Sequence, residues 1–233
     1  MFNRQQHSKL ITNSLVMILL FYIILAIITR ALFTLITPLW GEYQLLFLPI
    51  LLGYIGMSWG IFNLSYDPIV KWKNTRRVTF FIIAGAVTLF LSQIILIIIE
   101  WLPPYPVLVE TMYYIGVFLL FISGLLIAFG FFKFRQDLLP HYFDKYIAKY
   151  PNWFIIIAYI SQSFSYVFFV ISGLTFGNLG SAFEIIGYIV AGGSILSMAI
   201  GFYSIFISFR AFPKIMEVIE EVAGAKKKSK KAS

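Results

Sequence analysis

The sequence predicts an all-α polytopic membrane protein, a bundle of six transmembrane helices, and three observations lead to this fold class. First, 60% of the residues are hydrophobic and only 12% are charged. Second, six apolar stretches are each long enough to cross a bilayer core of about 30 Å, which takes about 20 helical residues. Third, these stretches lack the alternation of apolar and polar residues that marks the strands of transmembrane barrels. Helices also satisfy each backbone N–H within its own span, as the hydrocarbon requires.

The predicted spans follow one another with connections too short for a soluble domain. They cover residues 12–37, 44–65, 78–101, 108–132, 154–177 and 182–209. The first span has no AxA-type cleavage site, so we interpret it as uncleaved rather than as a signal peptide. Residues 1–211 form the predicted bundle, with an interfacial amphipathic segment at 133–153 that Pro140 and Pro151 interrupt. Residues 212–233 form a predicted cytoplasmic amphipathic segment with a Lys-rich tail.

The distribution of basic residues predicts the orientation. Of the 18 Lys and Arg residues, 17 lie in the N-terminal tail, between spans 2 and 3, between spans 4 and 5, or after span 6. By the positive-inside rule, both termini are therefore cytoplasmic. The expected location is the plasma membrane of the cell. It becomes the endoplasmic reticulum membrane if the source is eukaryotic, because Lys230 and Lys231 resemble a dilysine retrieval signal.

The net charge of +8 and the residue types exclude several classes of function. Basic residues at each cytoplasmic end attract anionic lipid headgroups, at about 1 kcal/mol per residue near the surface. We therefore expect anionic lipid, and no nucleic acid, as a partner. There is no cysteine for a thiolate metal site, and both histidines, His7 and His141, precede or follow the spans, which excludes bis-histidine haem ligation. No hydrolase or nucleotide-binding motif occurs, so we expect no enzyme, cofactor or metal.

Internal repetition is a further feature of the sequence. Residues 115–134 and 186–205 share seven of 20 positions at an offset of 71, and MSWGIF of span 2 lies in the register of IAFGFF of span 4. Two interpretations stand: three hairpins derived from one, or chance similarity between apolar segments. Small residues in these spans predict close packing, either within the chain or with another subunit. They are Gly56, Gly60, Gly124, Ala128, Gly187 and Gly201.

Charged residues near the outer side form the first candidate site. Arg30 lies inside span 1, about two-thirds across by the predicted orientation, and Glu100 ends span 3 on the same side. Arg30 either snorkels or pairs with a carboxylate, or it gates or binds a substrate. Glu42, Glu110 and Glu184 begin spans 2, 4 and 6. They either complement the helix dipoles from the first turn or surround an outward opening that attracts cations.

Polar residues inside two spans form the second candidate site. Ser92 and Gln93 lie on span 3, and Ser161, Gln162 and Ser165 lie on span 5. These side chains either line a hydrated path or form interhelical hydrogen bonds, which contribute about 0.6 kcal/mol each.

Two classes of function remain. The first is a membrane-embedded interaction, accessory or sensor-type subunit. For the chain in general we expect a protein partner or a homo-oligomeric state. The first class is favoured by the small-residue faces and by the C-terminal segment, where Ile215, Val218, Ile219 and Val222 follow helical spacing. The second is a small channel or transporter of a cation or small solute that uses the outer carboxylates and Arg30. The spans have no proline in their middle, unlike the broken helices of many carriers, which favours the first class.

Overall fold

The computed structural model of the chain is a bundle of long helices. It describes residues 4–33, 47–66, 75–101, 106–137, 151–175 and 177–232. For residues 25–33, 47, 100–101, 106, 137, 151–152, 215, 219–220 and 222–232 it describes the backbone alone. The helices are α1 (Arg4–Phe33), α3 (Phe47–Leu64), α4 (Thr75–Trp101), α5 (Pro106–Asp137), α6 (Pro151–Leu174) and α7 (Asn178–Ala232). No strand occurs in these ranges, so the predicted all-α class is confirmed.

The lengths and composition of the helices indicate a membrane location. Within the described ranges, α1, α4, α5, α6 and α7 are each long and apolar enough to cross a membrane. α3 contributes a shorter apolar stretch, Leu48–Leu64. Pro106 and Pro151 begin α5 and α6, a position that suits proline because the first helical N–H has no partner within the helix.

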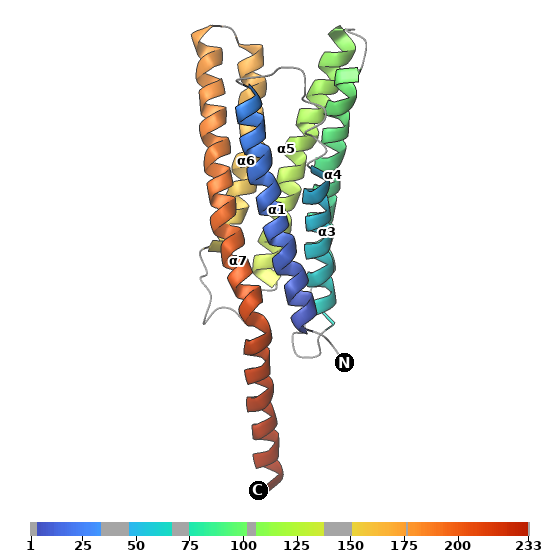
Figure 1. The fold of residues 1–233 in the computed structure, drawn as a ribbon, viewed down its shortest axis with the longest axis vertical. Coiled ribbons are helices and arrows are strands. Elements are labelled where there is room, and N and C mark those ends of the chain that lie inside the picture. The colour runs from blue at the N-terminus through green and yellow to red at the C-terminus, as the bar shows by residue number, and fades with distance from the viewer. Residues whose placement is uncertain are drawn as a thin grey trace.

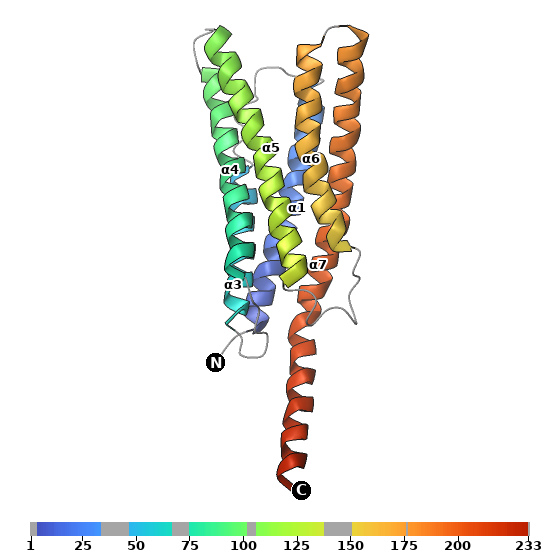
Figure 2. The ribbon, with the colours of Figure 1, turned by 180° about the vertical axis from the view of Figure 1, so that it is seen from behind.

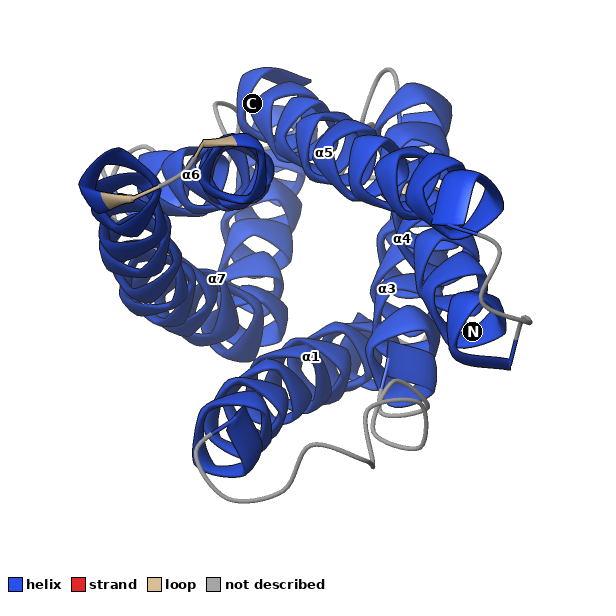
Figure 3. Ribbon diagram, turned by 90° about the horizontal axis from the view of Figure 1, so that it is seen from above, coloured by secondary structure: helices blue, strands red, loops and turns tan. Residues whose placement is uncertain are grey.

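The six helices form a closed ring in chain order. Each helix packs on the next one, and α7 returns to α1. Figure 3 shows this ring along the bundle, with α3 and α6 on opposite sides. α4 and α5 make one hairpin and α6 and α7 another, seen side by side in Figure 2. Figure 1 shows the first turns of α1 and the C-terminal part of α7 at the same end of the bundle.

Two helices extend beyond the predicted spans. α1 begins at Arg4, whereas the predicted span begins at residue 12, and α7 continues past residue 209 to Ala232. The last helix passes through Pro213, which removes one backbone hydrogen bond and costs about 3 kcal/mol. Phe209, Phe212 and Met216 are fully buried around this proline. Their burial, worth about 1.5–3 kcal/mol per side chain, offsets that cost.

The predicted interfacial segment is divided between elements. Residues 133–137 continue α5, residues 151–153 begin α6, and residues 138–150 lie outside the described part of the chain. The sequence places Pro140 in that outside part. The two described ends of this segment are therefore extensions of long helices.

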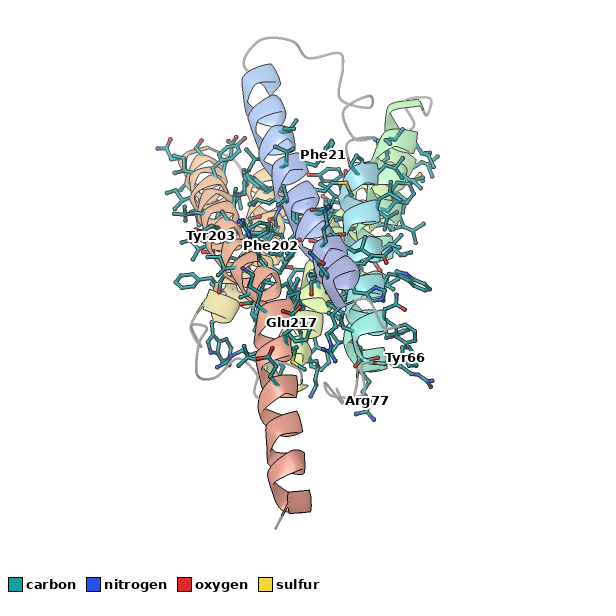
Figure 4. All side chains as sticks on the ribbon, turned by 60° about the horizontal axis from the view of Figure 1, so that its bottom comes forward. Phe21, Tyr66, Arg77, Phe202, Tyr203 and Glu217 are labelled. Atoms are coloured by element: carbon teal, nitrogen blue, oxygen red, sulfur yellow. The ribbon has the colours of Figure 1, made fainter. Side chains whose placement is uncertain are left out.

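Core and surface positions alternate along each helix with helical spacing. Phe202 is 1% exposed, whereas its neighbour Tyr203 is 65% exposed, and Figure 4 marks both on α7. The same spacing recurs between helices: every buried position of α3 between residues 48 and 66 has a buried counterpart 70 residues later in α5. Six buried positions of α1 have buried counterparts 71 residues later in α4. They are Ser8, Ile11, Ser14, Leu15, Ile18 and Tyr22, matched by Thr79, Ile82, Gly85, Ala86, Leu89 and Gln93.

Candidate functional site

The same glycine contact holds each of the three sequential helix pairs together. In each pair, a glycine of the second helix faces an isoleucine of the first. The pairs are Gly60 with Ile11, Gly130 with Ile82 and Gly201 with Ile155, and a Cβ on any of these glycines would lie under 3.0 Å from the isoleucine Cγ1. Carbon atoms pack at about 3.5–4.0 Å. These glycines therefore allow an approach that no larger residue permits.

The other predicted packing residues also lie against neighbouring helices of this chain. Gly56 faces the Ser14 side chain of α1, and Gly187 faces the ring of Phe169 on α6. Gly124 approaches Ser163 across the contact between α5 and α6, and Ala128 is buried. These small residues thus serve contacts inside the chain.

The serines of the predicted polar path bond mainly within their own helices. Ser92 Oγ donates to the Leu89 carbonyl at 2.6 Å, and Ser165 Oγ donates to the Gln162 carbonyl at 2.7 Å. Gln93 is buried with its Nε2 3.5 Å from the Ser92 hydroxyl, and Ser161 is half-buried. In the described part of the chain, no side-chain hydrogen bond joins the α4 residues of this path to its α6 residues, so they form two separate groups.

A hydrogen bond between two tyrosines crosses the ring. The hydroxyl of Tyr54 on α3 bonds to that of Tyr159 on α6, and both side chains are almost fully buried. Tyr22 of α1, also buried, lies close enough to the Tyr54 and Tyr159 hydroxyls to interact with both electrostatically. Since α3 and α6 lie on opposite sides of the ring, the three hydroxyls meet near its centre. A buried phenol normally has such a partner, because an unpaired hydroxyl is costly in an apolar interior.

Gln162 makes a second group of polar contacts beside the tyrosines. Its Nε2 donates to the Tyr166 hydroxyl at 3.2 Å. The Ser194 hydroxyl of α7 lies 3.3 Å from Gln162 Oε1 and 2.7 Å from the Ala191 carbonyl oxygen, and its single proton serves one acceptor at a time. Of the predicted path, Gln162 is thus the residue that bonds across a helix interface.

Aromatic rings bound this polar cluster on the side toward the C-terminal half of α7. The ring of Phe131 on α5 stacks on Tyr159 with centroids 5.8 Å apart and planes at 9°. The Phe202 ring of α7 packs on both, with its centroid 6.0 Å from that of Phe131 and 6.5 Å from that of Tyr159. We call Tyr22, Tyr54, Tyr159, Gln162, Tyr166 and Ser194 the axial cluster, and the Phe131 and Phe202 rings its floor.

The outer carboxylates are described only in part. Glu110 is exposed and accepts a hydrogen bond of 3.2 Å from the Tyr114 hydroxyl, and Glu184 is exposed on α7. Neither lies in the first turn of its helix, because α5 begins at Pro106 and α7 at Asn178, so that predicted placement is wrong. Glu42 lies outside the described residues.

The predicted ion pair between Arg30 and Glu100 involves side chains that the structure does not describe. The structure places the backbone of Arg30 in the last turns of α1 and that of Glu100 at the end of α4. Their side chains are not described. The predicted ion pair therefore stays a prediction.

Basic and aromatic side chains meet at the end of the bundle where α5 ends and α6 begins. The Arg135 guanidinium lies 4.2 Å from the centroid of the Trp153 ring. Lys133 Nζ lies 5.6 and 5.9 Å from the Phe129 and Phe132 rings. Such pairs place a positive charge beside an amphipathic ring, as is typical of the headgroup layer.

The described side chains offer no metal site, and the comparisons offer no relative. Among the residues that the structure describes, no three His, Asp or Glu side chains lie close enough to hold a metal ion. Comparison of the chain with protein-family models, curated proteins and solved structures gives no match. The arrangement of the side chains alone therefore has to carry any functional assignment.

Sequence reasoning missed the tyrosines of the axial cluster. Tyr22, Tyr54, Tyr159 and Tyr166 were not among the candidate residues, because tyrosine in a span is usually an interfacial anchor or a core residue. A usable signal existed in the internal register. Tyr54 and Tyr159 occupy positions at which the other two helix pairs carry residues without a polar side chain.

Proposed function

We propose that the chain is a six-span membrane protein of the plasma membrane, with both termini cytoplasmic and three related hairpins, that acts as a sensor-type interaction subunit. The first turns of α1 and the C-terminal part of α7 lie at the same end of the bundle, which agrees with both termini being on one side of the membrane. Exposed basic residues mark the same end, namely Arg76, Arg77, Arg210 and Lys214. The repeated glycine and isoleucine contacts support a common origin of the hairpins.

The single observation that carries this function is the continuity of α7. It is one helix of 55 residues, about 80 Å long, whereas a bilayer core is about 30 Å thick. The helix contains Ser194 of the axial cluster and extends past the other helices at its C-terminal end. A rigid connection of this kind transmits a displacement at the cluster to the cytoplasmic end.

The C-terminal part of α7 is the proposed contact with a partner. An isolated helix shorter than about 15 residues is marginal in water, so a protruding helix gains stability by docking. The sequence offers a partner the apolar spacing of residues 215–222, and it offers anionic headgroups the lysines of residues 226–231. Buried Phe209, Phe212 and Met216 fix the helix to the bundle just before it leaves.

Removing the end of α7 tests the proposal. We expect the full chain, extracted gently from its own membrane, to carry a stoichiometric second polypeptide in native mass spectrometry. A chain that ends at residue 218 should lose it. The matched control replaces the lysines of residues 226–231 by alanine and keeps the helix, so it separates lipid attraction from protein docking. A lone monomer or homo-oligomer in both preparations contradicts the interaction function.

The orientation has its own test because the chain contains no cysteine. Asn178→Cys should react with a membrane-impermeant maleimide on intact cells, since Asn178 begins α7 at the proposed outer side. Ser233→Cys should react only after permeabilisation. The opposite labelling pattern contradicts the proposed cytoplasmic termini.

The axial cluster favours a second candidate function, a small channel or carrier. A buried polar cluster at the centre of a helix ring is where a solute pathway would run. In that case Arg30 and the carboxylates Glu42, Glu110 and Glu184 would serve the outer entrance. Flux into proteoliposomes that changes in Arg30→Leu and Glu110→Gln variants would favour this function over the interaction function.

A further inference from the structure

A comparison of matching positions in the three hairpins distinguishes residues needed for packing from residues with another role. Packing residues recur in all described copies: Ser14, Gly85 and Ala158 keep one first-helix position small, and Met57, Ile127 and Met198 keep one second-helix position apolar. Ser123 and Ser194 both donate to a backbone carbonyl at 2.7 Å in their own helices. A position whose residue is required for the fold should show the same residue type in each copy.

At three core positions a phenol or an amide departs from this pattern in one copy. Smaller departures, each a hydroxyl in one copy, occur at Thr12, Ser58 and Ser163. Tyr54 of α3 occupies the position that matches Gly124 in α5 and Ile195 in α7. Tyr159 occupies the position of Leu15 and Ala86, and Gln162 that of Ile18 and Leu89. Because two apolar copies pack well at each position, the polar residue is not needed for packing.

These three departures lie together in space although they come from opposite sides of the ring. Tyr54 and Tyr159 bond to each other, and Gln162 follows Tyr159 by about one helical turn. Gln162 in turn bonds to Tyr166 and Ser194. Independent substitutions on separate helices would not be expected to converge on one point at the ring centre.

The chemistry of the cluster selects the kind of molecule that fits it. Its four phenols, one amide and one hydroxyl supply both donors and acceptors, and none carries a formal charge at neutral pH. Phe131 and Phe202 add aromatic faces from its floor. Burying an ion without a counter-charge is very costly, whereas burying a neutral polar group is compensated by hydrogen bonds.

We propose that the axial cluster is a binding site for a small uncharged solute that carries hydrogen-bond donors and acceptors. The bound solute replaces the hydrogen bond between Tyr54 and Tyr159 with bonds to itself. Contact with Ser194 then couples its presence to α7. This assignment deepens the sensor function proposed above and rests on it, by naming the class of molecule that is sensed.

A matched pair of cysteine variants in the full chain tests the site. Ser194 and Ser123 are both buried and make the same bond to their own helix, but Ser194 belongs to the axial cluster through its contact with Gln162, and Ser123 does not belong to it. Ser194→Cys and Ser123→Cys are therefore reconstituted in nanodiscs in the otherwise cysteine-free chain. Each is treated with a neutral probe, 2-hydroxyethyl methanethiosulfonate, and modification is followed by intact mass.

We expect the neutral probe to modify the Ser194→Cys variant at least tenfold faster than the Ser123→Cys variant. We also expect its rate to saturate with probe concentration, as it does when a bound complex precedes reaction. The cationic trimethylammonium and anionic sulfonate analogues of the probe should react slowly with both variants. Adding Gln162→Leu to Ser194→Cys should lower the neutral rate toward that of the control.

Several outcomes would overturn the assignment. Equal rates for the two variants, or a linear dependence on probe concentration, would show that no solute site lies at the cluster. Faster reaction with a charged probe would show that the solute class is wrong. These measurements need no partner protein, so loss of the partner in the α7 truncation would leave them unaffected, and the two proposals fail independently.

Discussion

The hairpins α4–α5 and α6–α7 pack alike but differ in what they carry. In both, a second-helix glycine lies against a first-helix side chain at matching heights: Gly130 and Gly201 against Ile82 and Ile155, Gly116 and Gly187 against Leu96 and Phe169. At two positions, however, α4 has Ala86 and Leu89 where α6 has Tyr159 and Gln162. The first hairpin thus packs without polar residues at these two positions. The second carries a phenol and an amide there.

The largest effect should come from breaking the shared packing. In Gly201→Leu, the new side chain would have to enter the space of Ile155, and overpacking of this kind costs about 3 kcal/mol. We expect the apparent melting temperature in detergent to fall by about 6–12 °C. The matched control is Gly193→Leu, because no described atom lies within 4 Å of a Cβ there. An equal loss in both variants would refute the assigned contact.

The equivalence of the hairpins predicts a smaller and uniform effect. Alanine at Gly60, Gly130 or Gly201 adds a Cβ that contacts the facing isoleucine. Alanine otherwise favours a helix by about 0.5–1 kcal/mol, so each variant should lose a net of about 1–2 kcal/mol in thermal unfolding. The three losses should agree within about 1 kcal/mol, given the usual scatter of such substitutions. One neutral variant beside two damaging ones would argue against related hairpins.

The sequence predicted the parts of this structure that depend on local pattern. Apolar length predicted the helices, and the offset of 71 paired Gly130 with Gly201 before their contacts were known. The spacing of residues 215–222 indicated a further helical segment. Its continuity with α7 through Pro213 could not be predicted in this way, because it depends on the burial of Phe212 and Met216. The bond between Tyr54 and Tyr159 spans 105 residues and depends on ring closure, which no local pattern encodes.

The bond across the ring predicts a coupling between its two partners. Tyr54→Phe or Tyr159→Phe leaves one buried hydroxyl without that partner, at a cost of about 1–2 kcal/mol. The double variant removes both hydroxyls, so it should lose about 1 kcal/mol less than the sum of the single losses. Thermal unfolding of the four proteins measures this coupling. Strictly additive losses would show that the two hydroxyls do not depend on each other.

The smallest effect on stability should come from making α6 resemble α4. Gln162→Leu introduces the residue that α4 carries at Leu89, and the lost interhelical contact with Ser194 is worth about 0.6 kcal/mol. The matching position of α1 also holds an apolar side chain, the fully buried Ile18. We therefore expect the melting temperature to change by at most about 2 °C. A strong destabilisation would mean that Gln162 is a structural residue after all, and a stable variant would leave binding as the reason why this one copy differs.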